Sequence, residues 1–145
     1  MSTRSRIGYY DYDTGCVKSV YCHFDGYVEG VGAVLEENYP TLEDAKAIVS
    51  LGGISSLGES LEYRDEDHEN GTRDYHRWRG EPIEIATDYG LSDYGNSAFD
   101  CGEEFAYLFI GGRWMILAEW WKAWREVKEA LAQFRGFEEM IEEEL

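Results

Sequence analysis

Apolar and polar residues alternate along the first part of the chain with the two-residue period of β-strands. This period predicts strands over residues 4–12 and 16–23, joined by a turn at residues 13–15 whose Asp-Thr-Gly sequence tolerates a positive φ. Two later segments, residues 105–110 and 113–117, show strand character on either side of a Gly-Gly turn. Two hairpins in one chain predict an antiparallel sheet.

Three segments have the helical period instead. Apolar residues at helical spacing predict a helix over residues 28–39, which Pro40 ends. Thr41 is the predicted N-cap of a second helix, because acidic residues fill the first turn after it, and Gly52-Gly53 ends that helix. An apolar stripe that begins at Trp120 predicts a C-terminal amphipathic helix.

The remaining segments separate these elements. Residues 59–81 contain many acidic side chains and predict an exposed loop, residues 83–87 predict a further strand, and residues 88–102 are rich in turn residues. The pattern predicts a single α+β domain over residues 1–145, with helices packed on one face of an antiparallel sheet built from hairpins. A hydrophobic content of 43% is sufficient for one buried core.

Composition argues against several functional classes. No apolar run reaches the roughly 18 residues of a membrane span, and residues 1–6 lack the apolar stretch of a signal peptide. The three cysteines, Cys16, Cys22 and Cys101, form no Cys-x-x-Cys pair and are expected to be free thiols in a reducing compartment. We therefore expect a cytoplasmic protein.

The net charge is the most unusual feature of the composition. Thirty Asp and Glu residues against thirteen Lys and Arg residues give a formal net charge of −17. A small soluble domain needs a net charge of only roughly 2–8. The excess argues against direct binding to nucleic acid or to an anionic membrane. It favours either a basic protein partner or a merely solvated acidic surface, as in many acidic or halophilic proteins.

The acidic residues are unevenly placed along the chain. Between Gly80 and Gly112 there are seven of them and no Lys or Arg. Closely spaced carboxylates imitate duplex DNA, which carries one charge per about 1.7 Å of its axis, and they attract a basic groove. Calcium is a weaker alternative, because no EF-hand loop pattern is present. The predicted partner-binding acidic residues are Glu62, Asp65, Glu66, Asp67, Glu69, Asp88, Asp93, Asp100, Glu103 and Glu104.

A second candidate site lies in the sequence Tyr-Cys-His-Phe-Asp-Gly-Tyr at residues 21–27. Residues two apart on a strand share a side, so His23 and Asp25 are candidates for a metal site or an acid–base pair. A zinc site needs about four ligands, and no neighbouring residues supply the others at standard spacing. The alternative is a structural turn in which Asp25 caps the following helix.

Two further patterns favour packing over chemistry. Residues 30–32 and 52–58 are rich in glycine, but neither stretch fits a phosphate-binding fingerprint and no Lys lies near them. We interpret them as sites of helix termination and close packing. Trp121 falls beside the apolar stripe of the C-terminal helix, so it is the predicted exposed aromatic contact for a partner.

Several of these segments support a family resemblance. Residues 1–8, 20–27, 30–32 and 51–58, together with Leu35 and Tyr39, are similar to a family of small acidic phage and prophage proteins. The resemblance implies an origin in a mobile element and no assigned enzymatic activity. Small acidic phage proteins are often inhibitors of host defence, of the anti-CRISPR or antirestriction type.

The predicted function is therefore a phage-encoded, non-enzymatic inhibitor of a host defence system, without cofactors. Its acidic, DNA-mimicking surface is expected to block the nucleic-acid-binding site of a CRISPR effector, a nuclease or a restriction subunit in the infected bacterium. The alternative is a small metal-assisted enzyme or ligand-binding domain centred on His23 and Asp25. A third interpretation is a structural or regulatory phage protein that oligomerises through exposed aromatic residues such as Trp121.

Overall fold

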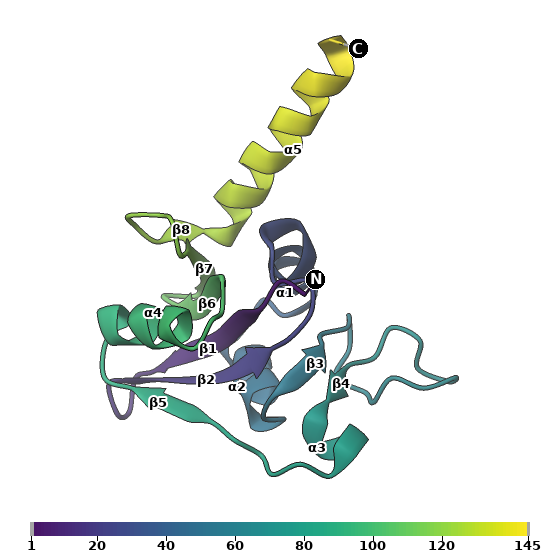
Figure 1. Cartoon of the computed structure of the whole chain (residues 1–145), viewed down its shortest axis with the longest axis vertical. Coiled ribbons are helices and arrows are strands. Elements are labelled where there is room, and N and C mark those ends of the chain that lie inside the picture. The colour runs from purple at the N-terminus through teal and green to yellow at the C-terminus, as the bar shows by residue number, and fades with distance from the viewer. Residues whose placement is uncertain (1, 145) are drawn as a thin grey trace.

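A mixed β-sheet forms the centre of the protein (Figure 1). The computed structural model describes residues 2–144, and the side chains of residues 2–136. Within that range the sheet has eight strands, in the order β4-β3-β2-β1-β6-β7-β8, with β5 paired to β2 beside β3. The strands are β1 (Ser5–Asp11), β2 (Cys16–Cys22), β3 (Ile54–Ser56), β4 (Arg73–Asp74), β5 (Ala86–Asp88), β6 (Phe105–Ile110), β7 (Arg113–Ala118) and β8 (Arg125–Glu126).

Both predicted hairpins are confirmed. β1 pairs antiparallel with β2, and β6 pairs antiparallel with β7. The prediction of a wholly antiparallel sheet is wrong, because the β1–β6 and β2–β3 pairs are parallel. The two hairpins meet through β1 and β6, and the long excursion between them brings the chain back to start β6 beside the start of β1. Local periodicity carries no information about the direction of such a distant partner.

The predicted helix boundaries are confirmed most clearly at Thr41. Its hydroxyl accepts a 3.1 Å hydrogen bond from the Asp44 amide, and the Asp44 carboxylate accepts one of 3.1 Å from the Thr41 amide. This capping box starts α2 and satisfies two amides that the helix leaves free. The helical elements are η1 (Val28–Gly32, a π-helical turn), α1 (Ala33–Asn38), α2 (Leu42–Ser50), α3 (Tyr75–Arg79), α4 (Leu91–Asp100) and α5 (Val127–Glu144).

The sheet has two unequal apolar faces. On the larger face, Ile7, Val20 and Tyr107 belong to a core that η1, α1, α2 and the start of α5 complete. On the opposite face, which we call the α4 face, Tyr94 of α4 packs with Val17 and neighbouring apolar residues. Helices therefore lie on both faces, which corrects the expectation of a single covered face. α4 contacts β5 and β6.

The segment predicted as turns and a strand is arranged differently. Residues 91–100 form α4, which the sequence did not indicate because Gly, Ser, Asn and Asp are poor helix formers. The predicted strand 83–87 is shifted, since only Ala86–Asp88 pair with β2 as β5. Ile83 and Ile85 lie before it in extended chain and are exposed.

The predicted C-terminal helix is present, but it begins seven residues after Trp120, at Val127. Val127 and Leu131 are buried and Phe134 is half-buried, so the described side chains of α5 have the expected apolar side. Residues 119–124 form turns instead of helix. As a result Trp120 is 65% exposed, whereas Trp121 is half-buried against the core, the reverse of the prediction.

The structure bears on the predictions about membrane spans and about the three cysteines. Within residues 2–144, no helix is both long enough and apolar enough to cross a membrane. Cys16 and Cys22 are buried free thiols and Cys101 is an exposed one. Burial raises the pKa of Cys22 to about 12, so this thiol remains protonated and packs as a small apolar side chain.

Candidate binding cleft and acidic loop

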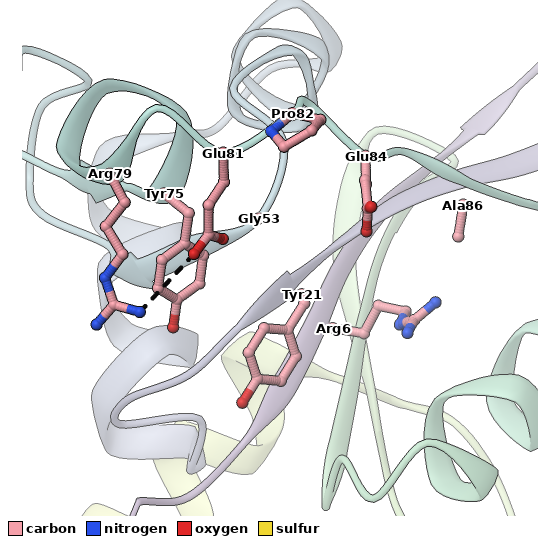
Figure 2. Close-up of a pocket in the computed structure, with 9 residues that line it drawn as sticks. All are labelled: Arg6, Tyr21, Gly53, Tyr75, Arg79, Glu81, Pro82, Glu84 and Ala86. Atoms are coloured by element: carbon pink, nitrogen blue, oxygen red, sulfur yellow. Dashed lines mark ion pairs between the residues drawn. The ribbon is translucent and has the colours of Figure 1, made fainter.

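A cleft of about 490 Å³ opens on the α4 face where two strands share one edge of β2 (Figure 2). β3 runs parallel to β2 from the pair Cys22–Ile54, whereas β5 runs antiparallel from the pair Ser19–Ala86. The two strands leave β2 in opposite directions, so a gap remains between them. Residues from five parts of the chain line this gap: Arg6, Tyr21, Gly53, Tyr75, Arg79, Glu81, Pro82, Glu84 and Ala86.

Two adjacent glycines shape the cleft. Gly52 has a φ of 77°, and a Cβ atom there would lie 3.1 Å from the Cα of Ile83. Its missing side chain therefore lets the crossing segment, residues 80–85 between α3 and β5, approach the end of α2. A Cβ atom on Gly53 would lie 3.2 Å from the Tyr75 ring. The Gly-Gly pair thus ends α2, as predicted, and also makes room for one wall of the cleft.

The floor of the cleft contains a buried ion pair. Arg6 is 9% exposed, and its Nε and Nη2 donate hydrogen bonds of 3.0 and 2.7 Å to the same oxygen, Oε1 of Glu103. Burial alone lowers the pKa of Arg6, but the hydrogen bond and the charge of Glu103 outweigh it, so the Arg6 pKa lies above its ordinary value. Arg6 is therefore a permanent cation whose charge Glu103 already balances.

Two tyrosines form the aromatic part of the cleft. Tyr21 comes from β2 and Tyr75 from the first residue of α3. The Tyr21 hydroxyl lies 2.5 Å from Nδ1 of His23. Burial raises the pKa of both Tyr21 and Tyr75 above the ordinary value, so both hydroxyls stay neutral at physiological pH.

The rim of the cleft carries charges of both signs. The Arg79 guanidinium lies 3.8 Å from the Glu81 carboxylate and 5.3 Å from the centre of the Tyr75 ring. Glu84 stands on the crossing segment, and no ion pair links it to a cation within the part of the chain whose side chains are described. Figure 2 shows its carboxylate directed toward the sheet, on the side of Tyr21 and Arg6. Glu84 is thus the uncompensated charge of the cleft.

The loop predicted over residues 59–81 is only partly confirmed, because residues 73–79 form β4 and α3; residues 59–71, which lie between β3 and β4, are called the acidic loop below. Backbone hydrogen bonds cross the loop, from the Thr72 amide to the Glu62 carbonyl at 2.8 Å and from the Ser60 amide to the Asn70 carbonyl at 3.2 Å. The loop therefore has a defined conformation. All five of its predicted partner-binding residues are exposed: Glu62, Asp65, Glu66, Asp67 and Glu69.

The only arginine of this loop points inward. Nε of Arg64 donates to the Gly71 carbonyl at 3.2 Å, and its Nη2 donates to the Ser56 hydroxyl. His68 lies 3.0 Å from Asp65, and their hydrogen bond lowers the pKa of Asp65. Among the described side chains, no ion pair compensates the other four predicted acidic residues of the loop. Its outer surface is therefore acidic, although Arg64 is present.

The second group of predicted acidic residues is less uniform. Asp93 and Asp100 are exposed on α4, and Asp88 and Glu104 are half-buried beside it. Glu103 is 2% exposed and holds Arg6, so it is unable to make the predicted surface contact. Figure 1 places α4 and the strands β3 and β4, which flank the acidic loop, at opposite ends of the sheet. The two groups therefore do not form one continuous acidic face.

The structure does not join His23 and Asp25. His23 contacts Tyr21, whereas the Tyr27 hydroxyl donates a 3.1 Å hydrogen bond to the Asp25 carboxylate. Asp25 has a φ of 59° and its carbonyl accepts from the Val31 amide at 2.7 Å, so it belongs to a turn. The side chain of Asp25 does not cap η1, contrary to the structural interpretation of this segment. No group of three or more His, Cys, Asp or Glu residues among the described side chains is arranged to hold a metal ion.

Trp121 is not a freely exposed aromatic residue. Its ring packs on the core, and the Arg125 guanidinium lies 4.1 Å from the ring centre. The exposed tryptophans of the described chain are Trp120 and, on α3 beside the cleft, Trp78. The prediction that Trp121 is the exposed aromatic residue is therefore wrong.

Sequence reasoning missed most residues of the cleft. Tyr75, Arg79 and Glu81 fall within the stretch predicted as an unstructured acidic loop, where no periodicity singles them out. Two signals did exist. The Gly52-Gly53 pair indicated close packing, and the alternation of Ile83, Glu84 and Ile85 indicated that Glu84 faces away from its neighbours.

Comparisons with protein families, with characterised proteins and with solved structures find no match to this chain.

Proposed function

We propose that this protein is a non-enzymatic inhibitor that binds a basic, nucleic-acid-binding host protein through its acidic surface. The observation that carries the proposal is the acidic loop. It exposes five carboxylates and turns its only arginine, Arg64, inward. Because the Debye length is about 8 Å at physiological ionic strength, such a local cluster matters more to a partner than the net charge of −17 does.

The order of the loop supports a binding role. The Thr72 hydroxyl accepts a 2.9 Å hydrogen bond from the Gly58 amide and donates one of 2.8 Å to the Ser60 carbonyl. Together with the backbone hydrogen bonds, this contact holds the carboxylates on a preformed framework. A preformed surface loses less conformational entropy when it binds than a disordered acidic tail does.

The chemistry of the loop defines the partner. Its carboxylates fit a groove of Lys and Arg side chains that normally binds phosphates. We further propose that the partner belongs to a host defence system, as the resemblance of the sequence to small acidic phage proteins implies, and that the protein acts as an anti-CRISPR or antirestriction inhibitor in the cytoplasm of the infected bacterium. The α4 group lies at the other end of the sheet, so we assign the primary contact to the acidic loop.

The test has two stages. Affinity capture from a bacterial lysate at low and at high salt identifies proteins held by charge, and a labelled nucleic acid bound to the captured protein then reports displacement. We expect the wild-type chain to displace it. A variant with Glu62, Glu66 and Glu69 changed to Gln is expected to displace it about tenfold or more less effectively, because three loop charges are lost.

A matched control has Glu29, Glu43 and Glu119 changed to Gln. These residues are exposed on other elements, so the control has the same net charge as the loop variant. It is expected to displace the nucleic acid within about twofold of the wild type. Equal loss in both variants would show that only net charge matters, and a captured protein that keeps its nucleic acid would contradict inhibition by competition.

A further inference from the structure

We propose that the cleft between β3 and β5 receives an arginine side chain of the partner. This inference rests on the proposed function, since the partner is the basic protein bound by the acidic loop. The guanidinium would lie against the rings of Tyr21 and Tyr75 and donate to the carboxylate of Glu84. The cleft would thereby fix the position of a partner that the loop attracts.

The charge balance of the cleft favours a cationic occupant. Arg6 is balanced by Glu103 through two hydrogen bonds to one oxygen, and Arg79 is balanced by Glu81 at 3.8 Å. Glu84 remains without a counterion among the described side chains. A bound anion would have to displace one of these pairs and approach Glu84, whereas a bound cation adds the missing positive charge.

The aromatic walls favour a guanidinium over an ammonium group. Arginine is planar, stacks on aromatic rings and binds a carboxylate through two parallel donors, whereas lysine presents a strongly hydrated point charge. Arginines already lie over an aromatic ring on α3, next to the cleft. Arg79 lies 4.6 Å from the centre of the Trp78 ring, and Arg73 lies 5.2 Å from the same ring on α3.

The position of the cleft links it to the acidic loop. Nη2 of Arg77 on α3 donates a 3.0 Å hydrogen bond to the Leu61 carbonyl, and its guanidinium lies 5.7 Å from the centre of the Tyr63 ring. The acidic loop and α3 are therefore fastened to each other. Trp78 on α3 and Ile83 on the crossing segment are exposed apolar residues on two elements that line the cleft, and apolar contacts often surround arginine anchors in protein interfaces.

The test uses a small probe and does not require the partner. The probe is the blocked tripeptide acetyl-Gly-Arg-Gly-amide, compared with the same peptide carrying citrulline, a neutral residue of the same shape. Titration followed by amide chemical shifts is expected to give saturable changes at Tyr21, Gly53, Tyr75 and Glu84. We expect the citrulline peptide to bind at least about fivefold more weakly, and Glu84→Gln to weaken arginine-peptide binding by a similar factor.

Glu119→Gln, which removes the same charge from an exposed site elsewhere, is expected to leave the affinity for the peptide unchanged. Equal binding of the two peptides, or shifts spread over the acidic surface and insensitive to Glu84→Gln, would overturn the assignment. The loop variant with Glu62, Glu66 and Glu69 changed to Gln is expected to keep the cleft-centred shifts. Failure of partner capture with intact peptide binding would therefore refute the proposed function alone, and the reverse result would refute the cleft assignment alone.

Discussion

The Tyr107 hydroxyl donates a 2.6 Å hydrogen bond to the carbonyl of Gly26, which lies 81 positions earlier in the chain. The contact ties the centre of β6 to the turn before η1, and both groups are buried. It anchors Gly26 to the core, whereas the neighbouring Phe24 and Asp25 are exposed. The turn is therefore held by tertiary contacts.

Tyr107→Phe is expected to destabilise the protein by about 1–3 kcal/mol, because the buried Gly26 carbonyl loses its partner while the packing volume is almost unchanged. Denaturant unfolding measures the effect as a lower midpoint with an unchanged slope. Tyr89→Phe is the control, because Tyr89 is 79% exposed. Its expected change is within about 0.5 kcal/mol. Equal effects of the two substitutions would contradict a structural role for the Tyr107 hydroxyl.

The Arg6–Glu103 pair gives a second prediction. Glu103→Ala leaves the Arg6 cation buried without a counterion and is expected to cost about 3–5 kcal/mol of unfolding free energy. The double variant Arg6→Met with Glu103→Leu removes both charges and is expected to recover most of that loss. A double variant as unstable as Glu103→Ala would show that packing, rather than the unpaired charge, dominates at this position.

The glycine beside the crossing segment gives a third prediction. Gly52→Ala is expected to cost about 1 kcal/mol for its positive φ and more for the close approach of Ile83. Gly80→Ala is the matched control, since its φ is 69° and no atom lies within 4 Å of an added Cβ. Each substitution lowers the free energy of unfolding, and the amount by which the loss for Gly52→Ala exceeds the loss for Gly80→Ala measures the cost of the close contact with residues 83–84. Identical losses would mean that the crossing segment moves aside without cost.

Asp88 gives a pH-dependent prediction. Burial raises the pKa of its carboxyl, and Oδ2 has no hydrogen-bond partner among the described groups. Because the folded-state pKa is the higher one, the folded state binds the proton more tightly, and stability is lost as the pH rises through that pKa. Asp88→Asn is therefore expected to be more stable than the wild type at pH 7, by less than about 1 kcal/mol.

The gain should disappear at about pH 3, where the wild-type carboxyl is protonated in both states. Thermal unfolding of both proteins across this range provides the measurement. Asp93→Asn is the control because Asp93 is an exposed neighbour on α4. A gain for Asp93→Asn as large as that for Asp88→Asn would assign the effect to overall charge rather than to burial.

The sequence predicted those parts of the fold that local chemistry determines. The hairpins β1–β2 and β6–β7 and the helix capped by Thr41 follow from turn residues, alternation and capping, all within a few neighbouring positions. α4 and the parallel β1–β6 pair were missed because distant contacts decide them. Tyr94, for example, packs with Val17 and Leu108, and this tertiary contact stabilises a helix whose own residues are poor helix formers.

The candidate site also has features that the neighbouring sequence predicts and features that depend on distant contacts. Exposure of the five acidic residues of the loop was predictable, because consecutive charges rarely find enough buried partners. The burial of Glu103 was not, because its partner Arg6 lies 97 positions away. The cleft could not be predicted from the sequence either, because it forms where β3 and β5 diverge from β2.

The parallel pairing of Ser5 with Phe105 has a consequence for synthesis of the protein. The middle of the sheet joins two strands that lie far apart along the chain, so β1 leaves the ribosome long before β6, and such distant pairings fold slowly. Until β6 has emerged, β1 has one unpaired edge that is able to template aggregation. Chains truncated before residue 105 are therefore expected to accumulate as insoluble material, whereas chains that include β6 and β7 can close this part of the sheet.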